Sequence, residues 1–308
     1  MRKLPTAGAQ RESTVMLPQE SPSPLNVDYA GRPTIAWWRA ARQFAATIFG
    51  VATKPLYQAY ERKLMSGVLL RPVPRHVGII LDGNRRYGQQ WGFTDPAQIY
   101  AFGARKLDDV LDWCAELAIP AVTLWVCSTD NLSRPADQVS GILAAVEAKL
   151  LSLVDNPRIH RQRVRVQTIG RSELLPERTV AAIRAAREAT AGYDGMVLTI
   201  AIAYGGREEI VDSVRTLLNE EAAAGHSLRE AIERVTPDTI GAHMYLAGVS
   251  DPDLIIRTSG EIRMSGFLLW QSANSEFYFS DVFWPAFRKI DFLRAVRAFQ
   301  QRHRRFGL

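Results

Sequence analysis

Residues 76–88 read HVGIILDGNRRYG, and this stretch sets the pattern for the whole chain. Its first part is aliphatic over the length of a buried β-strand, and it ends in Asp-Gly-Asn followed by two arginines. Taken alone, Asp-Gly-Asn after a strand is typical of a turn, because Gly allows positive φ and Asp and Asn cap the next helix. The stretch therefore predicts a buried strand, and it indicates a ligand site only if other strand ends carry matching groups.

From residue 76 onward, apolar runs of strand length alternate with longer helical periods. The predicted strands are 76–82, 121–128, 163–170, 196–206 and 253–260, with 275–281 as a sixth. Between them, the ranges 99–117, 136–153, 177–190 and 207–224 have apolar residues spaced by three and four. Near-continuous apolar strands separated by helices predict an α/β fold, namely a single domain with a central, mostly parallel six-stranded sheet flanked by helices.

The first part of the chain has a different composition from the rest. Residues 1–34 are rich in Pro, Ser, Thr and Gly and are predicted to be a disordered tail. Residues 35–74 are predicted to be an N-terminal helical extension, in which 35–52 is too short and too charged to span a bilayer. That helix either packs on the main domain, predicted over 75–308, or lies at a membrane surface through its tryptophans and arginines.

Charge and cysteine content narrow the setting of the protein. The net charge of +6 and a pI near 9.5 fit an anionic partner, which nucleic acid, acidic lipid or a phosphorylated small molecule would satisfy. Nucleic acid is disfavoured because the arginines cluster at strand ends and the C-terminus without a groove-reading motif. Cys114 and Cys127 lack C-x-x-C spacing, so we expect neither a disulfide framework nor a zinc site, and we predict a cytoplasmic protein with possible membrane association.

Polar side chains follow three of the predicted strands at the point where each strand ends. In parallel sheets ligands bind at the carboxyl ends of the strands, so these groups should share one rim. Each group also has an ordinary explanation as a turn, a helix cap or a solvated charge. The three sets are Asp82, Gly83, Asn84, Arg85 and Arg86; Ser128, Thr129, Asp130, Asn131 and Arg134; and Arg257, Thr258, Ser259, Gly260, Glu261, Arg263 and Ser265.

Together these groups match a diphosphate bound with a divalent metal. Arginines offer forked donors to phosphate oxygens, glycines let backbone N–H groups approach the anion, and a carboxylate supplies a hard oxygen to Mg²⁺. The sequence contains neither G-x-x-x-x-G-K-[ST] nor G-x-G-x-x-G, so a nucleotide is the weaker candidate.

Six blocks of sequence resemble, in order, the signature blocks of the cis-prenyltransferases, the undecaprenyl diphosphate synthase family. The resemblance covers about residues 75–307 and implies a catalytic domain over 75–308, a hydrophobic tunnel and a homodimer. It implies condensation of isopentenyl diphosphate with an allylic diphosphate in Z geometry, with Mg²⁺ as cofactor. The blocks are HVGIILDGNRR (76–86), STDNLSRP (128–135), AYGGREEI (203–210), DPDLIIRTSGEIRMSGFLLWQ (251–271), SEFYFSDVFWPAF (275–287) and RHRRFG (302–307).

The resemblance also implies a role for each motif position. Asp82 would handle Mg²⁺ and diphosphate, and Asn84 and Ser128 would lie near the reacting carbons and assist proton removal. Glu276 would help with the metal near the dimer interface, and the tail 305–307 (Arg-Phe-Gly) would reach into the partner's site. The substrate-binding positions are Gly83, Arg85, Arg86, Tyr87, Arg134, Arg257, Arg263 and Ser265, the last three for isopentenyl diphosphate.

The chain departs from the family pattern after Gly92, where FTDPAQIYAFG (93–103) stands in place of a stretch with an Arg and a Gly-His pair. Tyr100 in that stretch and Gln138 are the departures that bear on the chemistry. They leave open an enzyme that ionises a prenyl diphosphate but couples it irregularly, cyclises it or hydrolyses it. A non-catalytic partner subunit is a further alternative.

The length of the product depends on how far it can grow along the tunnel. Two residues before Ser128, where medium-chain members have a small residue, this chain has Val126, preceded by the large Trp125. A bulkier wall favours an early stop, so we predict a short product such as (2Z,6E)-farnesyl diphosphate from geranyl diphosphate or a similar starter. The alternatives are a medium-chain polyprenyl product and a Val126 that only packs the core.

Overall fold

The computed structural model describes residues 55–302. The predicted tail (1–34), the predicted helix within 35–52 and the terminal motif 305–307 lie outside the described residues. The chain divides into two compact units, residues 1–58 and 59–308, and the α/β domain belongs to the second.

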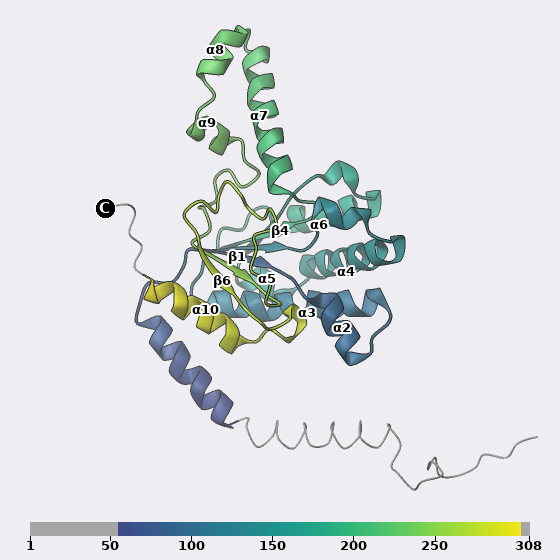
Figure 1. The fold of residues 1–308 in the computed structure, drawn as a ribbon, viewed down its shortest axis with the longest axis vertical. Helices are drawn as coiled ribbons and strands as arrows, with labels where there is room; N and C mark the ends of the chain where they lie inside the picture. The colour runs from purple at the N-terminus through teal and green to yellow at the C-terminus, as the bar shows by residue number, and fades with distance from the viewer. Residues whose placement is uncertain (1–54, 303–308) are drawn as a thin grey trace, which may run out of the picture. The chain divides into compact units, whose positions relative to one another are not determined.

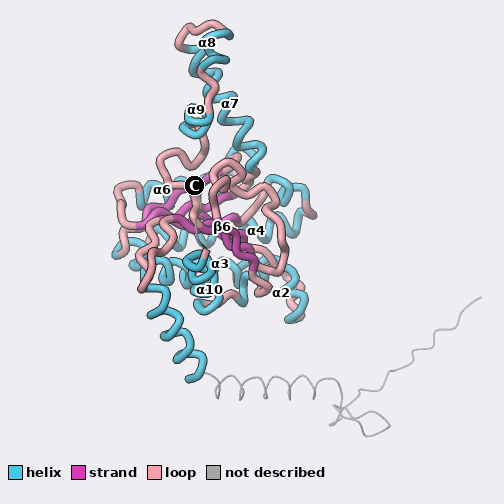
Figure 2. Tube along the Cα trace, turned by 60° about the vertical axis from the view of Figure 1, so that its left-hand side comes forward, coloured by secondary structure: helices cyan, strands magenta, loops and turns pink. Residues whose placement is uncertain are grey.

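The core of that unit is a six-stranded sheet in which every neighbouring pair of strands is parallel (Figures 1 and 2). The prediction of a mostly parallel six-stranded sheet is confirmed. The inner strands β1, β2 and β5 are buried at every residue, which explains their unbroken aliphatic sequences. In spatial order the strands are β3 (Val164–Ile169), β4 (Met196–Ala201), β2 (Ala121–Trp125), β1 (His76–Ile80), β5 (Leu254–Arg257) and β6 (Glu276–Phe279).

Helices flank the sheet, and each of the four helices predicted between strands is present within a few residues of its expected bounds. Residues 55–69 are also helical, as the sequence predicts. The α-helices are α2 (Asn84–Trp91), α3 (Pro96–Glu116), α4 (Ala136–Val154), α5 (Pro157–Arg161), α6 (Glu177–Thr190), α7 (Gly206–Ala223), α8 (Leu228–Glu233), α9 (Pro237–Ala242) and α10 (Lys289–Gln301). Three 3₁₀ turns, η1 (Thr129–Ser133), η2 (Ser172–Leu174) and η3 (Trp284–Ala286), complete the described elements.

Adjacent residues of a strand lie on opposite faces of the sheet, so Leu124 and Trp125 of β2 have different surroundings. Trp125 at the end of β2 joins an aromatic cluster, stacking on Phe267 with ring centroids 5.3 Å apart and meeting Tyr204 edge-on. The preceding Leu124 lies on the other face, in a cavity lined by α3 and α4. The bulk of Trp125 is therefore directed away from that cavity, and the expectation that Trp125 adds to its wall is wrong.

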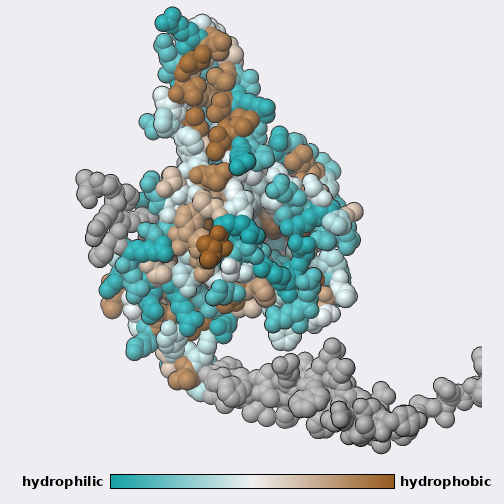
Figure 3. All heavy atoms as spheres, in the orientation of Figure 1, coloured by the Kyte–Doolittle hydropathy of each residue, from teal (hydrophilic) through white to brown (hydrophobic). Residues whose placement is uncertain are grey.

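Helices α7, α8 and α9 form an arm, residues 206–242, that extends beyond the sheet (Figures 1 and 2). Large apolar residues are exposed on this arm, and Figure 3 shows hydrophobic atoms gathered along it. They are Val211, Leu228, Ile232 and Val235. Isolated exposed apolar residues are ordinary, but a contiguous group of them is typical of an interaction surface.

The helix over residues 55–69 packs on α10 through its second half. Leu64 and Val68 are buried, and the Gln300 amide of α10 donates to the carbonyl of Val68 at 2.8 Å. Lys289 at the start of α10 pairs with Glu61 at 3.6 Å. Among residues 55–302 no helix is long and apolar enough to cross a membrane.

Candidate active site

The polar groups at the ends of β1, β2 and β5 meet in one pocket of about 720 Å³. This pocket, the diphosphate pocket below, is lined by every predicted site residue except Tyr87 and Glu276. The sheet topology explains this, because β2, β1 and β5 are adjacent parallel strands whose carboxyl ends share an edge. The predicted residues that it brings together are Asp82, Gly83, Asn84, Arg85, Arg86, Ser128, Arg134, Arg257, Arg263 and Ser265.

Arg257 is the organising side chain of the pocket. Although it is an arginine, it is only 4% exposed, and its guanidinium makes three hydrogen bonds in different directions. Nη1 donates to the carbonyl of Arg263 at 2.6 Å and to Oγ of Ser265 at 2.7 Å, and Nη2 donates to Oδ2 of Asp82 at 2.8 Å. Arg257 thus fixes the loop that follows β5 to the end of β1, and it holds Asp82 in place.

Asp82 is kept ionised by its neighbours. Burial raises its pKa, but the hydrogen bond and charge of Arg257, the backbone N–H of Gly83 and the charge of Arg86 together outweigh burial and leave the pKa below its ordinary value. Arg86 lies 3.5 Å from Oδ1 of Asp82. The pocket therefore presents a carboxylate that is already charged, next to two guanidinium groups.

The backbone around the pocket takes conformations that sequence alone does not reveal. In the loop after β5, Ser259 and Ser265 have φ of 80° and 52°, in the left-handed region that non-glycine residues seldom occupy. Gly83 has φ of 98°, and a Cβ there would lie 2.6 Å from the Phe283 ring. Strained backbone of this kind gathers at ligand sites, where it directs backbone N–H groups toward an anion.

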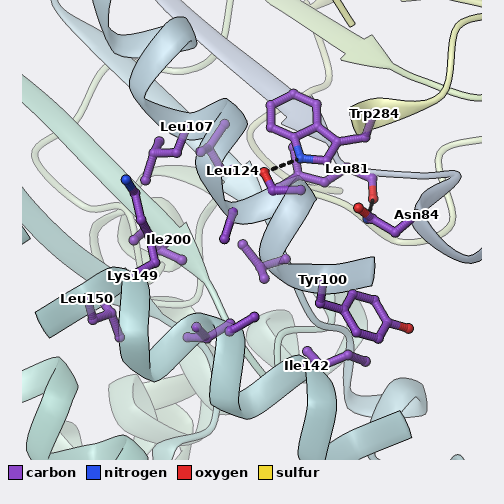
Figure 4. A pocket seen from close by; sticks show the side chains of 15 residues that line it. Leu81, Asn84, Tyr100, Leu107, Leu124, Ile142, Lys149, Leu150, Ile200 and Trp284 are labelled. Carbon is purple, nitrogen blue, oxygen red and sulfur yellow. Dashed lines mark hydrogen bonds between the residues drawn. The ribbon is translucent and has the colours of Figure 1, made fainter. Parts of the chain in front are cut away.

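An apolar cavity of about 60 Å³ opens beside the diphosphate pocket, between α3, α4 and the sheet (Figure 4). The residues that line both spaces mark the junction between them: Leu81, Asn84, Tyr100, Val126 and Ile142. The far end is lined by Leu107, Leu124, Lys149, Leu150 and Ile200. A polar pocket joined to an apolar cavity suits a ligand with an anionic head and a hydrocarbon tail.

Two buried polar atoms at the junction lack hydrogen-bond partners within the described residues. They are Oδ1 of Asn84 and the hydroxyl of Tyr100. Asn84 donates to the carbonyl of Leu81 at 3.0 Å, which turns its oxygen over Gly103 of α3, where a Cβ would lie 2.3 Å away. Burial raises the pKa of Tyr100, while the charges of Arg134 and Arg85 and the close approach of the Arg134 side chain lower it in part. The clearer case of an unpartnered atom at the junction, on geometry alone, is therefore Oδ1 of Asn84. Buried polar atoms without partners are rare and indicate that a ligand satisfies them.

The comparisons with known proteins agree with this geometry. A family profile described as putative undecaprenyl diphosphate synthase matches residues 80–307. The chain belongs to the cis-prenyltransferase family. An isoprenyl transferase of Deinococcus radiodurans is 53% identical over 253 residues, which are 82% of this chain and 92% of that protein. A (2Z,6E)-farnesyl diphosphate synthase of Thermobifida fusca is 49% identical over 258 residues, covering 84% and 99% of the two chains.

A solved structure shares the fold. The crystal structure of lavandulyl diphosphate synthase from Lavandula x intermedia in complex with dimethylallyl diphosphate superposes with a TM-score of 0.70. It is 30% identical and covers 77% of this chain and 99% of that one. The chain is accordingly a cis-prenyltransferase, a Z-isoprenyl diphosphate synthase that condenses isopentenyl diphosphate with an allylic diphosphate.

Two predicted site residues of the cis-prenyltransferase lie outside the pocket. Tyr87 is not among the residues that line it, and its ring packs 6.1 Å from that of Trp91. Glu276 begins β6 in register with Leu254, so it lies at the amino edge of the sheet, whereas Asp82 lies beyond the carboxyl edge. Within one chain, therefore, Glu276 and Asp82 do not form a shared metal site, and the predicted role of Glu276 near a dimer interface stays a prediction.

Two residues that the predictions left out take part in the site. Ser259 accepts from Nη2 of Arg86 at 2.7 Å, and Glu261 pairs with Arg86 at 3.0 Å and also with Arg263. Both were on the predicted rim, but their sequence gave no signal beyond a turn. Ser128, in contrast, has the geometry of a helix cap, because its Oγ accepts from the N–H of Asn131 at 3.1 Å.

The donor set fits Mg²⁺ in one particular way. Residues 55–302 contain no group of three or more His, Cys, Asp or Glu that could hold a metal ion by themselves. Mg²⁺ in phosphoryl and diphosphate sites is commonly held by one or two carboxylates together with substrate oxygens and water. Asp82, ionised and partly exposed beside the arginines, meets that requirement.

Proposed function

We propose that the enzyme joins isopentenyl diphosphate to geranyl diphosphate and releases a short product, (2Z,6E)-farnesyl diphosphate. The observation that carries this proposal is the small apolar cavity, about 60 Å³, that adjoins the diphosphate pocket and shares five lining residues with it. A prenyl tail that grows from the pocket fills this cavity after few additions. The similarity to the farnesyl diphosphate synthase of Thermobifida fusca supports the same product.

In this proposal the diphosphate pocket holds the two anionic heads. Five arginines and three carboxylates line it, so its charge favours anions. Gly83 and Arg86 bind the allylic diphosphate, with Arg85 and Arg134 at the outer side. Arg257, Arg263 and Ser265 bind isopentenyl diphosphate. Because Ser259 and Glu261 already contact Arg86, they set the direction from which its guanidinium meets phosphate oxygens.

The chemistry follows from this placement. The C–O bond of the allylic diphosphate breaks, and its electron pair leaves with the diphosphate. The double bond of isopentenyl diphosphate bonds to the freed carbon, and the C2 proton passes to the released diphosphate as a new double bond forms. Preorganised guanidinium groups stabilise the charge that develops on the departing diphosphate, and the apolar cavity keeps water from the cationic carbon. Asn84 and Ser128 assist proton removal, and Oδ1 of Asn84, which has no partner among the described residues, is an acceptor at the junction.

Mg²⁺ is part of the proposal, with Asp82 as the residue that holds it. When bound with the diphosphate, the ion supplies neutralising positive charge to the leaving group. A metal role for Glu276 requires a second chain, since Glu276 lies at the other edge of its own sheet.

A homodimer fits the surface of the described residues. The arm of residues 206–242 exposes Leu228 at 74% and Ile232 at 60%, and exposed apolar residues grouped in this way are typical of an interaction surface. We propose that a second copy covers part of this arm. The tail residues 305–307, which the resemblance assigns to the partner's site, lie outside the described residues.

The products themselves test the proposed function. Purified enzyme with Mg²⁺ and labelled isopentenyl diphosphate is given dimethylallyl, geranyl or farnesyl diphosphate in turn, and the products are separated by chromatography. We expect geranyl diphosphate to be the best starter and a fifteen-carbon Z,E product to dominate. A ladder of much longer products would instead support a medium-chain polyprenyl diphosphate synthase, as the description of the family profile suggests.

A second candidate rests on Tyr100 at the junction and on the fold shared with lavandulyl diphosphate synthase. In it the enzyme ionises a prenyl diphosphate and couples it irregularly, cyclises it or hydrolyses it. Omitting isopentenyl diphosphate from the same assay discriminates between the two. Diphosphate release and a prenyl product from the allylic substrate alone would contradict chain elongation.

Val126 is the wall residue that the sequence indicated, and it lies at the junction of pocket and cavity. Replacing Val126 by Ala gives the tail lateral room there, so we expect products longer by one isoprene unit to appear beside the fifteen-carbon product. The measurement is the chromatographic product profile at equal total turnover. An unchanged profile would show that Val126 only packs the core.

A further inference from the structure

The far wall of the apolar cavity contains a charged residue. Of the described residues that line it, Lys149 of α4 is the one that carries a full charge, and the labelled residues on the same side of the cavity in Figure 4 are Leu107, Leu150 and Ile200. Figure 4 shows Lys149 at the end away from Asn84 and Tyr100. A lysine on a helix of this kind normally extends its ammonium into water, so its presence in the lining of a hydrocarbon site calls for an explanation.

Lys149 is held in place by a partner on the opposite helix. Its Nζ donates to both carboxylate oxygens of Asp108 at 2.7 Å, so the pair bridges α4 and α3. Asp108 follows Leu107, which itself lines the cavity, and the backbone carbonyl of Asp108 accepts from Arg158 at 3.2 Å. The Lys149 side chain is 13% exposed. The two helices that form the cavity walls are thus joined by an ion pair at its far end.

The position of the ion pair along α3 and α4 shows how far it lies from the junction. On α3 the lining residues run from Tyr100 to Leu107, seven steps on. On α4 they run from Ile142 to Leu150, and Lys149 also lies seven steps from the first of them. Seven helical steps rise about 10 Å, so the ion pair lies roughly that far from the junction. A tail that enters at the junction meets the methylene stem of Lys149 and then its paired ammonium.

We propose that the Lys149–Asp108 ion pair ends chain growth and so sets the product length of this enzyme. The inference rests on the proposed function, in which the tail grows into this cavity. Leucine side chains in the wall can change rotamer to make room for a longer prenyl tail, and contact between the tail and leucine carries no desolvation cost. The ion pair resists, because a longer tail must either separate Lys149 from Asp108 or surround the ammonium with hydrocarbon, and both leave a charge poorly solvated.

Four variants separate the charge from the size of the side chain. Lys149→Ala removes stem and charge, Lys149→Met keeps the length but has no charge, and Asp108→Asn keeps the shape of the partner while weakening the pair. The matched control is Lys106→Met, which removes an ion pair of the same 2.7 Å length, to Asp109, on α3. Lys106 does not line the cavity.

Each variant is given geranyl diphosphate and excess labelled isopentenyl diphosphate, and the products are resolved by chain length. We expect the main product of Lys149→Ala to be at least one isoprene unit longer than that of the wild type. For Lys149→Met and Asp108→Asn we expect the share of longer products to rise at least tenfold, and for Lys106→Met no change. Wild-type lengths from both Lys149 variants, at measurable turnover, would overturn the proposal.

A binding readout keeps the inference separate from the proposed function. The rise in melting temperature is measured with non-hydrolysable farnesyl and geranylgeranyl thiodiphosphates, which needs no turnover. We expect the wild type to be stabilised more by the farnesyl probe, and Lys149→Met to lose or reverse that preference. A wild type that makes no condensation product but shows this reversal would contradict the proposed function alone. A fifteen-carbon product with no reversal and no lengthening would contradict the Lys149 inference alone.

Discussion

Replacing Asp82 by Ala is expected to lower kcat/KM by about 10³-fold, since a preorganised charged group at a developing charge commonly contributes 10²–10³-fold. The variant loses both the oxygen proposed to hold Mg²⁺ and the acceptor that fixes Nη2 of Arg257. Steady-state rates over a range of Mg²⁺ concentrations measure the effect, and added Mg²⁺ should not restore activity. The matched control is Asp130→Asn, because Asp130 lines the same pocket and makes no ion pair with the described residues. Near-normal turnover of Asp82→Ala would contradict the assignment of Asp82.

The unfolding free energy of Asp82→Ala is also expected to depend on pH in a way that measures the structural role of Asp82 separately from its role in catalysis. The pKa of Asp82 is lowered in the folded state, so the stability that this carboxylate contributes is present above its ordinary pKa of 3.8 and is lost as the pH falls through the lowered value. Asp82→Ala lacks this contribution. Its unfolding free energy should therefore lie about 1–3 kcal/mol below that of the wild type near neutral pH, and the gap should close in acid.

The fold could be predicted from the sequence because strands buried on both faces of a sheet require unbroken aliphatic runs, and such runs are easily recognised. The unbroken aliphatic runs at β1, β2 and β5 predicted inner parallel strands, and those strands are buried at every residue. Parallel neighbours place their carboxyl ends at one edge, which is why residues far apart in the chain, such as Asp82 and Arg257, could be expected together. Fold and rim were thus predicted by one and the same pattern.

The sequence failed where the outcome depends on side-chain direction or on single contacts. Trp125 and Val126 are adjacent, but only Val126 faces the cavity, since successive residues point to opposite sides of the sheet. The motif at Glu276 does not show which edge of the sheet the residue occupies, and strand register places it at the amino edge. Lys149 and Asp108 are charges on amphipathic helices and resemble solvated surface residues in the sequence, so only the packing of α3 on α4 shows that they form an ion pair at the cavity wall.

Arg257→Lys is expected to lower kcat/KM for isopentenyl diphosphate by about 10²-fold or more, although it keeps the charge. The guanidinium of Arg257 reaches the Arg263 carbonyl, Ser265 and Asp82 in three fixed directions, and a lysine ammonium at the end of a different stem cannot reproduce that fork. Released from Arg257, Ser265 is free to leave its left-handed conformation, and the loop that carries the proposed diphosphate-binding groups loses its position.

The loss should appear mainly as a higher KM for isopentenyl diphosphate, because Arg257 directly contacts Arg263 and Ser265, two of its proposed binding groups. A smaller rise is expected in the KM for the allylic substrate, because Arg86 depends on Ser259 and Glu261 of the same loop. Arg163→Lys serves as the control. The guanidinium of Arg163 makes two hydrogen bonds, to Asp194 and to the Gly192 carbonyl. Arg163 is exposed and precedes β3, at the edge of the sheet away from the diphosphate pocket. If Arg257→Lys retained wild-type kinetics for both substrates, its charge alone would be what the site requires, and the fork geometry would have no part in binding isopentenyl diphosphate.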